Sequence, residues 1–162
     1  MTSAFLFALG LCLASVLVTG GWLAFLVFLN EEPCCPFGWT KFGSRCFNFN
    51  YNSKIWADAE RTCISFGGNL ASVHSLEELN LLKAWMNRVT SHLAQTWIGG
   101  HDAVKEGVWL WSDGSSLNFT QWAHGQPNNS GDEDCVEILW RSSTWYDSKC
   151  THSRPFICAK RL

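Results

Sequence analysis

Apolar and polar residues alternate with different periods in different parts of this chain of 162 residues. Residues 1–29 carry no charged side chain, and residues 4–29 are almost continuously apolar. Residues 4–18 have the length of a signal-peptide core, and the small residues Thr19, Gly20 and Gly21 follow them. We therefore expect residues 1–29 to be a signal peptide. The alternative is an uncleaved signal anchor, because this apolar stretch is long enough to span a bilayer.

Two later stretches have the period of an amphipathic helix. The first has apolar residues three and four positions apart, at Trp56, Ala59, Cys63 and Phe66. This helix is expected to begin near Ser53 and to end at Gly67 and Gly68. Ser75 and Glu78 have the spacing of a capping box and predict the start of the second helix. Its apolar stripe consists of Leu79, Leu82, Met86 and Val89.

Short apolar runs replace the helical period elsewhere. Residues 39–50 alternate apolar and polar side chains, as a strand or a hairpin does. After Gln95, glycines and polar turns separate the apolar runs, and we expect strands at 96–98, 108–111, 136–140, 144–146 and 155–159. Residues 112–134 have little periodicity, and a long irregular loop in a compact domain is usually functional or disordered. Trp122 and Cys135 indicate that this loop is ordered.

The distribution of charge narrows the functional classes. All 12 Lys and Arg and all 14 Asp and Glu follow residue 30, so the net charge of −2 belongs to the part of the chain after the apolar segment. Binding to nucleic acid requires a basic face. We therefore expect no nucleic-acid partner.

The cysteines indicate an oxidising compartment. Cys12 lies in the apolar segment, and seven cysteines follow it, at 34, 35, 46, 63, 135, 150 and 158. Their pairing cannot be resolved from the spacing alone. Zinc is the competing use of clustered cysteines, but no two matched C-x2-C pairs occur, and exported chains favour disulfides.

Residues 126–134 read Gln-Pro-Asn-Asn-Ser-Gly-Asp-Glu-Asp and concentrate side-chain oxygens more than any other segment. Calcium binds about six to eight oxygen ligands, which carboxylates, amide carbonyls and waters supply. Asp147 adds a further carboxylate shortly afterwards. The segment therefore predicts a site for a hard cation. A solvated polar turn is the alternative for such a run.

No enzyme signature accompanies this segment. Disulfide-bonded cysteines cannot act as nucleophiles, no His-x3-His pair could hold a hydrolytic metal ion, and no set of Ser, His and Asp can be singled out. We expect no catalytic activity and no catalytic residues.

Motifs of a known family occur in order along the chain. They are Cys35-Pro-x-Gly-Trp39, Cys46, a helix bearing Cys63, Trp97-Ile-Gly-Gly100, Trp109-x-Trp111, Gln126-Pro-Asn128, Glu133-Asp-Cys135, Trp145-x-Asp-x-x-Cys150 and Pro155-Phe-Ile-Cys158. Over residues 35–160 this pattern resembles the C-type lectin domain, most closely the small secreted lectins of fish, which include ladderlectin-like proteins, and the related type II antifreeze proteins. The resemblance implies an α+β, C-type lectin-like fold with two helices, short antiparallel sheets, a long irregular ligand loop and disulfide staples. Residues 30–34 are then a linker.

The resemblance also implies which cysteines pair. The family's long-form pattern assigns the bridges Cys35–Cys46, Cys63–Cys158 and Cys135–Cys150. The last bridge would fasten the end of the polar loop to the strand that carries Asp147. Cys34 is the odd cysteine of the seven and a candidate for an intermolecular bridge in a homodimer.

In this family the sugar site is a calcium ion whose shell is completed by two vicinal sugar hydroxyls. The resemblance assigns its ligands to Gln126, Asn128, Glu133 and Asp147, and it makes Pro127 a candidate cis-proline. In the family, Glu-Pro-Asn accompanies mannose-type sugars and Gln-Pro-Asp accompanies galactose-type sugars. The Gln-Pro-Asn of this chain is a hybrid of the two.

Two departures from the family pattern concern this site. The family has Trp-Asn-Asp where this chain has Trp145, Tyr146 and Asp147, so a phenol replaces one amide; we count Tyr146 with the sugar-binding residues. The two neutral amides also leave the site with less charge than usual, and calcium affinity rises with ligand charge. The family's auxiliary calcium site would use Asp102, Glu106, Asn129 and Asp134, together with Glu133.

Two glycosylation sequons begin at Asn118 and Asn128. A glycan on Asn128 would remove its amide from metal binding, whereas Asn118 has no such conflict. We therefore expect glycosylation at Asn118.

Two functions from different classes follow from the resemblance. The first is a calcium-dependent lectin that recognises mannose- or galactose-type glycans on microbial or host surfaces, in innate defence. The second is an interaction protein of the same fold that binds protein or ice without a sugar site. In either case we expect a secreted, extracellular protein, or a type II single-pass membrane protein if the N-terminal segment is not cleaved.

Overall fold

The computed structural model describes residues 34–89 and 95–162. The predicted signal peptide or anchor lies outside these residues and stays a prediction. Within the described residues, no helix has the length and apolar character needed to cross a membrane.

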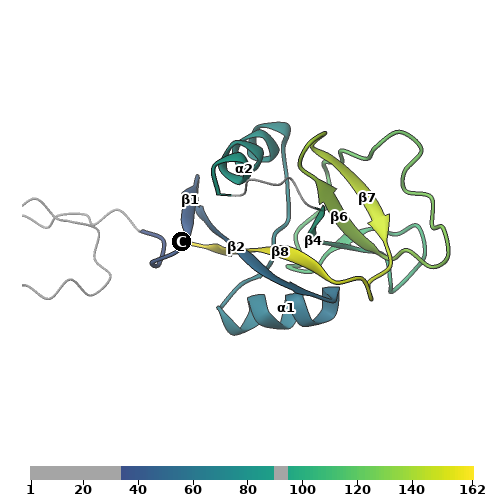
Figure 1. The fold of residues 1–162 in the computed structure, drawn as a ribbon, viewed down its shortest axis with the longest axis horizontal. Helices are drawn as coiled ribbons and strands as arrows, with labels where there is room; N and C mark the ends of the chain where they lie inside the picture. The colour runs from purple at the N-terminus through teal and green to yellow at the C-terminus, as the bar shows by residue number, and fades with distance from the viewer. Residues whose placement is uncertain (1–33, 90–94) are drawn as a thin grey trace, which may run out of the picture.

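The described part of the chain has an α+β architecture, with two helices on opposite sides of the β2–β8 ribbon (Figure 1). In chain order the elements are β1 (Thr40–Phe42), β2 (Arg45–Lys54), α1 (Trp56–Ser65), β3 (Asn69–Leu70), α2 (Leu76–Val89), β4 (Gln95–His101), β5 (Leu110–Trp111), β6 (Cys135–Leu139), β7 (Thr144–Ser148) and β8 (Arg154–Arg161). The predicted α+β class is confirmed. The short strand β3 was not predicted, because two residues are too few to show a period.

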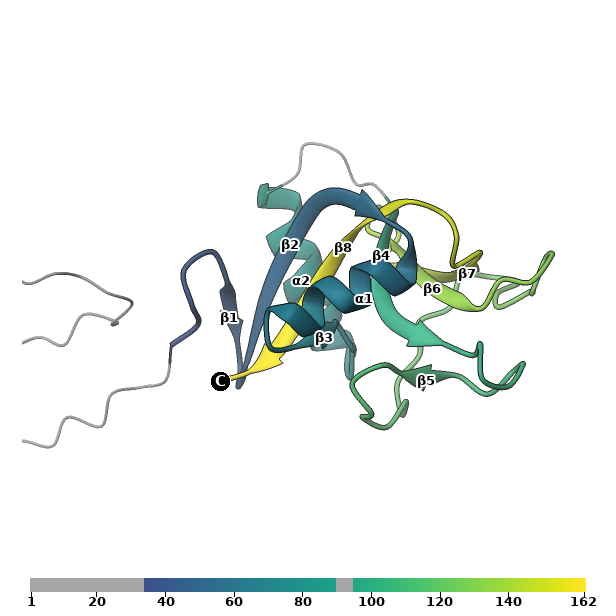
Figure 2. The same ribbon diagram turned by 90° about the horizontal axis from the view of Figure 1, so that it is seen from below.

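The strands join into one sheet with the order β1-β2-β8-β4-β6-β7, to which β3 adds beside β8 and β5 beside β4 (Figure 2). The pairs are antiparallel except between β4 and β8, where Trp97 lies beside Phe156 in parallel orientation. This one parallel contact connects the expected short antiparallel sheets into a single mixed sheet.

Both predicted helices are present, with one shifted start. The first begins at Trp56 rather than near Ser53, because β2 still pairs with β8 at Lys54. The second starts as the capping box predicts, since the Glu78 N–H donates to Ser75 Oγ at 3.1 Å. Its apolar stripe, Leu79, Leu82 and Met86, is buried.

Aromatic packing holds the long loop against the sheet. Trp145 on β7 is fully buried, and the rings of Trp111, Phe119 and Trp122 surround it with centroids 5.5, 5.7 and 5.8 Å away. The Trp145 N–H donates to Gln121 O at 2.8 Å. As predicted, residues 112–134 form no helix or strand beyond an isolated bridge of Trp122 with Trp145, and yet they are packed in place.

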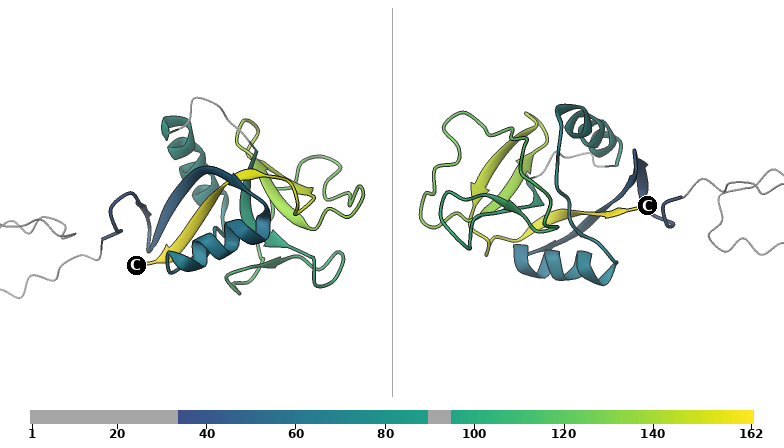
Figure 3. Two further views of the ribbon diagram at one scale, coloured as in Figure 1. Left: turned by 60° about the horizontal axis from the view of Figure 1, so that its bottom comes forward. Right: turned by 180° about the vertical axis from the view of Figure 1, so that it is seen from behind.

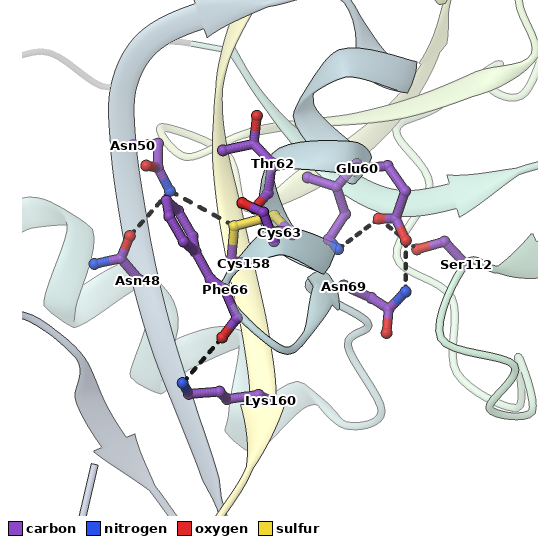
Figure 4. Close-up of a disulfide and its surroundings, with 12 residues drawn as sticks. Asn48, Asn50, Glu60, Thr62, Cys63, Phe66, Asn69, Ser112, Cys158 and Lys160 are labelled. Atoms are coloured by element: carbon purple, nitrogen blue, oxygen red, sulfur yellow. Dashed lines mark hydrogen bonds between the residues drawn. A yellow bond between two sulfur atoms is a disulfide. The ribbon is translucent and has the colours of Figure 1, made fainter. Parts of the chain in front are cut away.

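The three implied disulfides, Cys35–Cys46, Cys63–Cys158 and Cys135–Cys150, are all present. Cys63–Cys158 joins α1 to β8 across 95 residues of chain, which corresponds to about 4 to 5 kcal/mol in the chain-entropy model (Figure 4). Beside it, Glu60 accepts hydrogen bonds from Asn69 and Ser112, so α1 is also tied to β3 and to the start of the long loop.

Cys34 does not match its prediction. It is disulfide-bonded, and no described cysteine is a free thiol. Because one sulfur forms only one disulfide, the expected homodimer through an odd Cys34 thiol loses its basis.

A hydrogen-bonded network that was not predicted connects α2, β2 and the turn after β5. Arg45 on β2 donates to Glu78 Oε1 at 2.7 Å and to Ser72 Oγ at 2.9 Å. Ser72 Oγ in turn donates to Asp113 Oδ2 at 2.6 Å, and the Ser115 N–H donates to Asp113 Oδ1 at 2.9 Å. The network fixes the first turn of the long loop.

Candidate functional site

The long loop lies at the end of the molecule opposite the chain's C-terminus (Figure 3). The peptide bond between Gln126 and Pro127 is cis, as the resemblance implied. The backbone N–H groups of Asn128 and Asn129 both donate to Asp147 Oδ2, at 2.7 and 2.6 Å. Since Asp147 belongs to β7 and is only 3% exposed, its carboxylate fastens the loop to the sheet.

The two predicted amide ligands contact one another. Asn128 Nδ2 donates to Gln126 Oε1 at 2.8 Å. This bond uses the Gln126 oxygen that the resemblance assigns to calcium, so a bound ion would have to share that oxygen with Asn128 or replace the bond.

The predicted auxiliary residues form a second, more acidic group. Carboxylate oxygens of Asp102, Glu106 and Asp134 lie within 4.8 Å of one another. Asp102 follows β4, and its N–H donates to Asp134 O at 3.0 Å, just before β6. The Gly107 N–H donates to Asp102 Oδ2 at 2.8 Å and closes the turn that carries Glu106. Two neighbouring strands of the sheet therefore bring these three carboxylates together.

Asn129 joins the acidic group to the rest of the loop. Its Nδ2 donates to Glu106 Oε2 at 2.6 Å, and its Oδ1 accepts the Glu133 N–H at 2.9 Å. Glu133 Oε2 accepts the Ser130 N–H at 3.2 Å. Asn129 has φ +47°, a left-handed conformation that asparagine tolerates better than most residues. Asn129 thus links Glu133 to Glu106 of the acidic group.

Two carboxylate oxygens in this region are buried and have no hydrogen-bond partner among the described residues. They are Asp102 Oδ1 and Asp147 Oδ1. Leaving a buried acceptor unsatisfied costs about 1 to 3 kcal/mol, and more for a charged group. A hard cation with oxygen ligands would satisfy both atoms, so the residues present fit calcium.

The electrostatics of the acidic group agree with this fit. Burial, reinforced by the negative charges of Asp134 and Asp147, raises the pKa of Asp102 despite the hydrogen bond from Gly107. Loss of surrounding water and repulsion from Asp102 and Asp134 raise the pKa of Glu106 as well. The carboxylates repel one another, and a divalent cation would remove that repulsion.

Comparison with known proteins identifies the family. The model of the lectin C-type domain matches residues 52–160. The chain belongs to the C-type lectin family. It is 46% identical over 129 residues to the galactose-specific lectin nattectin of Thalassophryne nattereri. The aligned region covers 79% of this chain and 81% of that protein. It is 47% identical over 132 residues to ladderlectin of Oncorhynchus mykiss, with 80% of this chain and 70% of that protein covered.

The fold matches solved members of the C-type lectin family. The crystal structure of a calcium-independent type II antifreeze protein superposes with a TM-score of 0.74 at 34% identity, over 82% of this chain and 98% of that one. The expected C-type lectin fold and the likeness to fish lectins and type II antifreeze proteins are therefore confirmed. The chain is a lectin-family protein and not an enzyme.

Two predicted residues of this C-type lectin, Tyr146 and Asn118, are not among the proposed ion ligands. Tyr146 pairs across the strands with Glu137, whose carboxylate accepts from Arg154 Nε at 2.8 Å. The Tyr146 hydroxyl has no hydrogen bond within the described part of the chain. Asn118 is exposed on the long loop, as a glycosylation site requires.

Sequence reasoning gave no role to Lys149, whose side chain reaches the loop at Gly131. The sequence nevertheless contains a feature that sets Lys149 apart. From Gln126 to Cys150 the chain has five acidic residues and only two basic ones, Arg141 and Lys149, and Lys149 adjoins a loop-fastening cysteine.

Proposed function

We propose that this protein is an exported, calcium-dependent lectin that recognises surface glycans in innate defence. Its sugar-binding calcium ion is held by Gln126, Asn128, Glu133 and Asp147, and Tyr146 contacts the sugar. A second ion is held by Asp102, Glu106, Asn129 and Asp134. The three disulfides support export, since such bonds persist in oxidising compartments.

One observation carries this proposal: Asp102 Oδ1 and Asp147 Oδ1 are buried carboxylate oxygens without partners. Each belongs to one of the two proposed ion sites, and in each carboxylate the other oxygen, Oδ2, already accepts backbone N–H groups. A hard cation with oxygen ligands is one partner that would satisfy these two carboxylate oxygens.

The sugar class is proposed from the first residue of the Gln-Pro-Asn motif. Gln126 matches the galactose-type motif at that position, and the similar protein nattectin is named a galactose-specific lectin. Asn128 matches the mannose-type motif instead. We therefore propose weak binding to both classes, with galactose-type glycans preferred.

The decisive experiment is a calcium titration combined with a panel of immobilised sugars. We expect retention on galactose resin that requires calcium and that chelator reverses. Glu133→Gln and Asp147→Asn should each abolish retention and greatly weaken calcium binding, because each removes an anionic ligand while keeping the side-chain volume. Glu77→Gln on α2 removes the same charge away from the loop and should behave like wild type.

Calcium affinity within about twofold of wild type in both loop variants would refute the ligand assignment, since loss of a residue that merely supports a ligand typically costs about 10-fold or more. Circular dichroism of each variant shows whether the fold is intact.

A second candidate function is binding of ice or protein without a sugar site. The bond between Gln126 and Asn128 favours it, because Gln126 Oε1 already has a hydrogen-bond donor without an ion. Val104, Val108 and Leu110 also expose 77%, 42% and 42% of their area near the acidic loop. Thermal hysteresis or partner binding that persists in chelator, with no retention on any sugar, would establish this function in place of the lectin.

A further inference from the structure

Lys149 is held firmly beside the acidic loop although its side chain is exposed. It follows Ser148, the last residue of β7, which pairs with Cys135 on β6. It precedes Cys150, whose disulfide returns to the same Cys135. Pairing on one side and a covalent bond on the other fix the backbone from which the lysine side chain extends.

The lysine side chain crosses the loop at Gly131. A Cβ atom added to Gly131 would lie 3.2 Å from Lys149 Nζ and 3.5 Å from Lys149 Cε. Gly131 has φ +80°, a conformation that favours glycine and leaves this space open for the lysine. The ammonium group therefore lies directly over the turn that precedes Asp132.

The loop that this ammonium group overlies is acidic. Residues 126–134 contain three acids, Asp132, Glu133 and Asp134, and no basic residue. The carboxylate of Asp134 also lies within 4.8 Å of those of Asp102 and Glu106. The Lys149 ammonium group makes no ion pair within 4.0 Å and no hydrogen bond to another described residue, and only the backbone carbonyl of Lys149 is bonded, by the His152 N–H at 2.9 Å. Its attraction to the loop therefore acts through the field of several carboxylates.

We propose that Lys149 is a built-in counter-ion of the loop that sets its calcium affinity. When no cation is bound, the ammonium group offsets part of the acidic charge and keeps the loop in place. When calcium binds, the same positive charge repels the ion and weakens its binding. This inference rests on the proposed function only in its second half, because the stabilisation of the ion-free loop requires no calcium site.

Lys149→Gln tests the proposal, because it removes the charge and keeps most of the side-chain stem. We expect calcium to bind about three- to tenfold more tightly to this variant at low salt, as Coulomb's law gives for one unit charge about 10 Å from a divalent ion. The gain should shrink at about 0.5 M salt, where such interactions are screened. In chelator, the variant should unfold at a lower temperature than wild type. Lys149→Arg should restore both properties.

Arg141→Gln is the matched control. It removes the same charge from an exposed residue in the turn between β6 and β7, at the other end of β7. We expect its calcium affinity and its unfolding temperature in chelator to equal those of wild type. Equal effects of Lys149→Gln and Arg141→Gln would show that only net charge matters and would overturn the proposal.

The outcomes separate this inference from the proposed function. If wild type binds calcium and Lys149→Gln binds it equally well, the counter-ion role fails and the calcium site stands. If wild type binds no calcium at all, the proposed lectin function fails. The unfolding temperatures in chelator then decide the counter-ion role alone, since an unchanged temperature for Lys149→Gln would refute it.

Discussion

Asp113 and Asp102 both lie in turns that follow strands, but they differ in burial and in the number of carboxylate oxygens that accept hydrogen bonds. Asp113 is exposed, and both of its carboxylate oxygens accept hydrogen bonds, from Ser72 and Ser115. Asp102 is 1% exposed, and one of its oxygens has no partner. The usual pattern is the reverse: a buried carboxylate has hydrogen-bond partners for both oxygens, because water cannot supply them, whereas an exposed one can rely on water.

The pKa values of these two carboxyl groups move in opposite directions. Although the residue is exposed, its carboxyl group loses part of its surrounding water, which alone would raise the pKa of Asp113. Hydrogen bonds from Ser115 and Ser72, helped by the charge of Arg45, outweigh this effect and lower the pKa. For Asp102, burial and the neighbouring carboxylates prevail and raise the pKa. Asp113 thus stabilises the fold without a ligand. Burial of the Asp102 carboxylate instead costs free energy, which a bound cation would offset. This is the difference expected between a structural carboxylate and the metal ligand that we propose Asp102 to be.

The largest expected effect is on Asp102. Asp102→Asn should weaken calcium binding about 10- to 100-fold, the range associated with damage to a metal site. In chelator the variant should be at least as stable as wild type at pH 7, because the amide removes a buried charge that lacks a cation. Isothermal titration and thermal unfolding measure the two quantities. If Asp102→Asn binds calcium normally, or loses stability in chelator, then Asp102 is a structural residue like Asp113.

The second prediction adds negative charge to the site of the two amide side chains, Gln126 and Asn128. Gln126→Glu and Asn128→Asp should each tighten calcium binding about tenfold, since a charged partner contributes roughly 1.5 to 3 kcal/mol against about 1 for a neutral one. Gln126→Glu should also shift sugar preference toward mannose, and Asn128→Asp should shift it toward galactose. Binding to a sugar array measures the shift. Tighter calcium binding with an unchanged sugar preference would mean that this loop does not select the sugar.

The smallest expected effect is on Asp113. Because its pKa is lowered in the folded protein, its stabilising contribution is present above the ordinary value of 3.8 and is lost as the pH falls through the folded value. Asp113→Asn should lower the free energy of unfolding at pH 7 by about 1 kcal/mol, since the group is exposed to solvent. The difference from wild type should shrink as the pH falls below 3.8. Calcium affinity should not change, and a change would place Asp113 in the ion site.

The sequence predicted much of this architecture because several signals are local or come with the family pattern. The stripe of Leu79, Leu82 and Met86 predicted α2, and the motif order implied the disulfides and the cis bond before Pro127. The start of α1 was wrong by a few residues, because the pairing of Lys54 with β8 depends on a strand a hundred residues away. Local periodicity cannot contain that information.

The candidate site shows the same limit. The acids of both ion sites were assigned by resemblance, but the sequence could not show that Gln126 and Asn128 bond to each other or that Asp102 lacks a partner. Those properties depend on side-chain geometry. Lys149 was missed for a similar reason, since its contact with Gly131 joins residues on two sides of a disulfide.

Strands β1, β2 and β8 lie side by side at the end of the molecule away from the long loop, and the Leu162 N–H donates to Ser44 O at 3.0 Å (Figure 1). The described chain therefore starts and finishes on one edge. If the C-terminus were attached to a sensor surface or to a fused partner, the protein would be held at that edge. The long loop would then face away from the attachment. Several copies displayed in this way on one support would present their loops in the same direction, so that weak individual contacts with a repetitive surface could add through avidity.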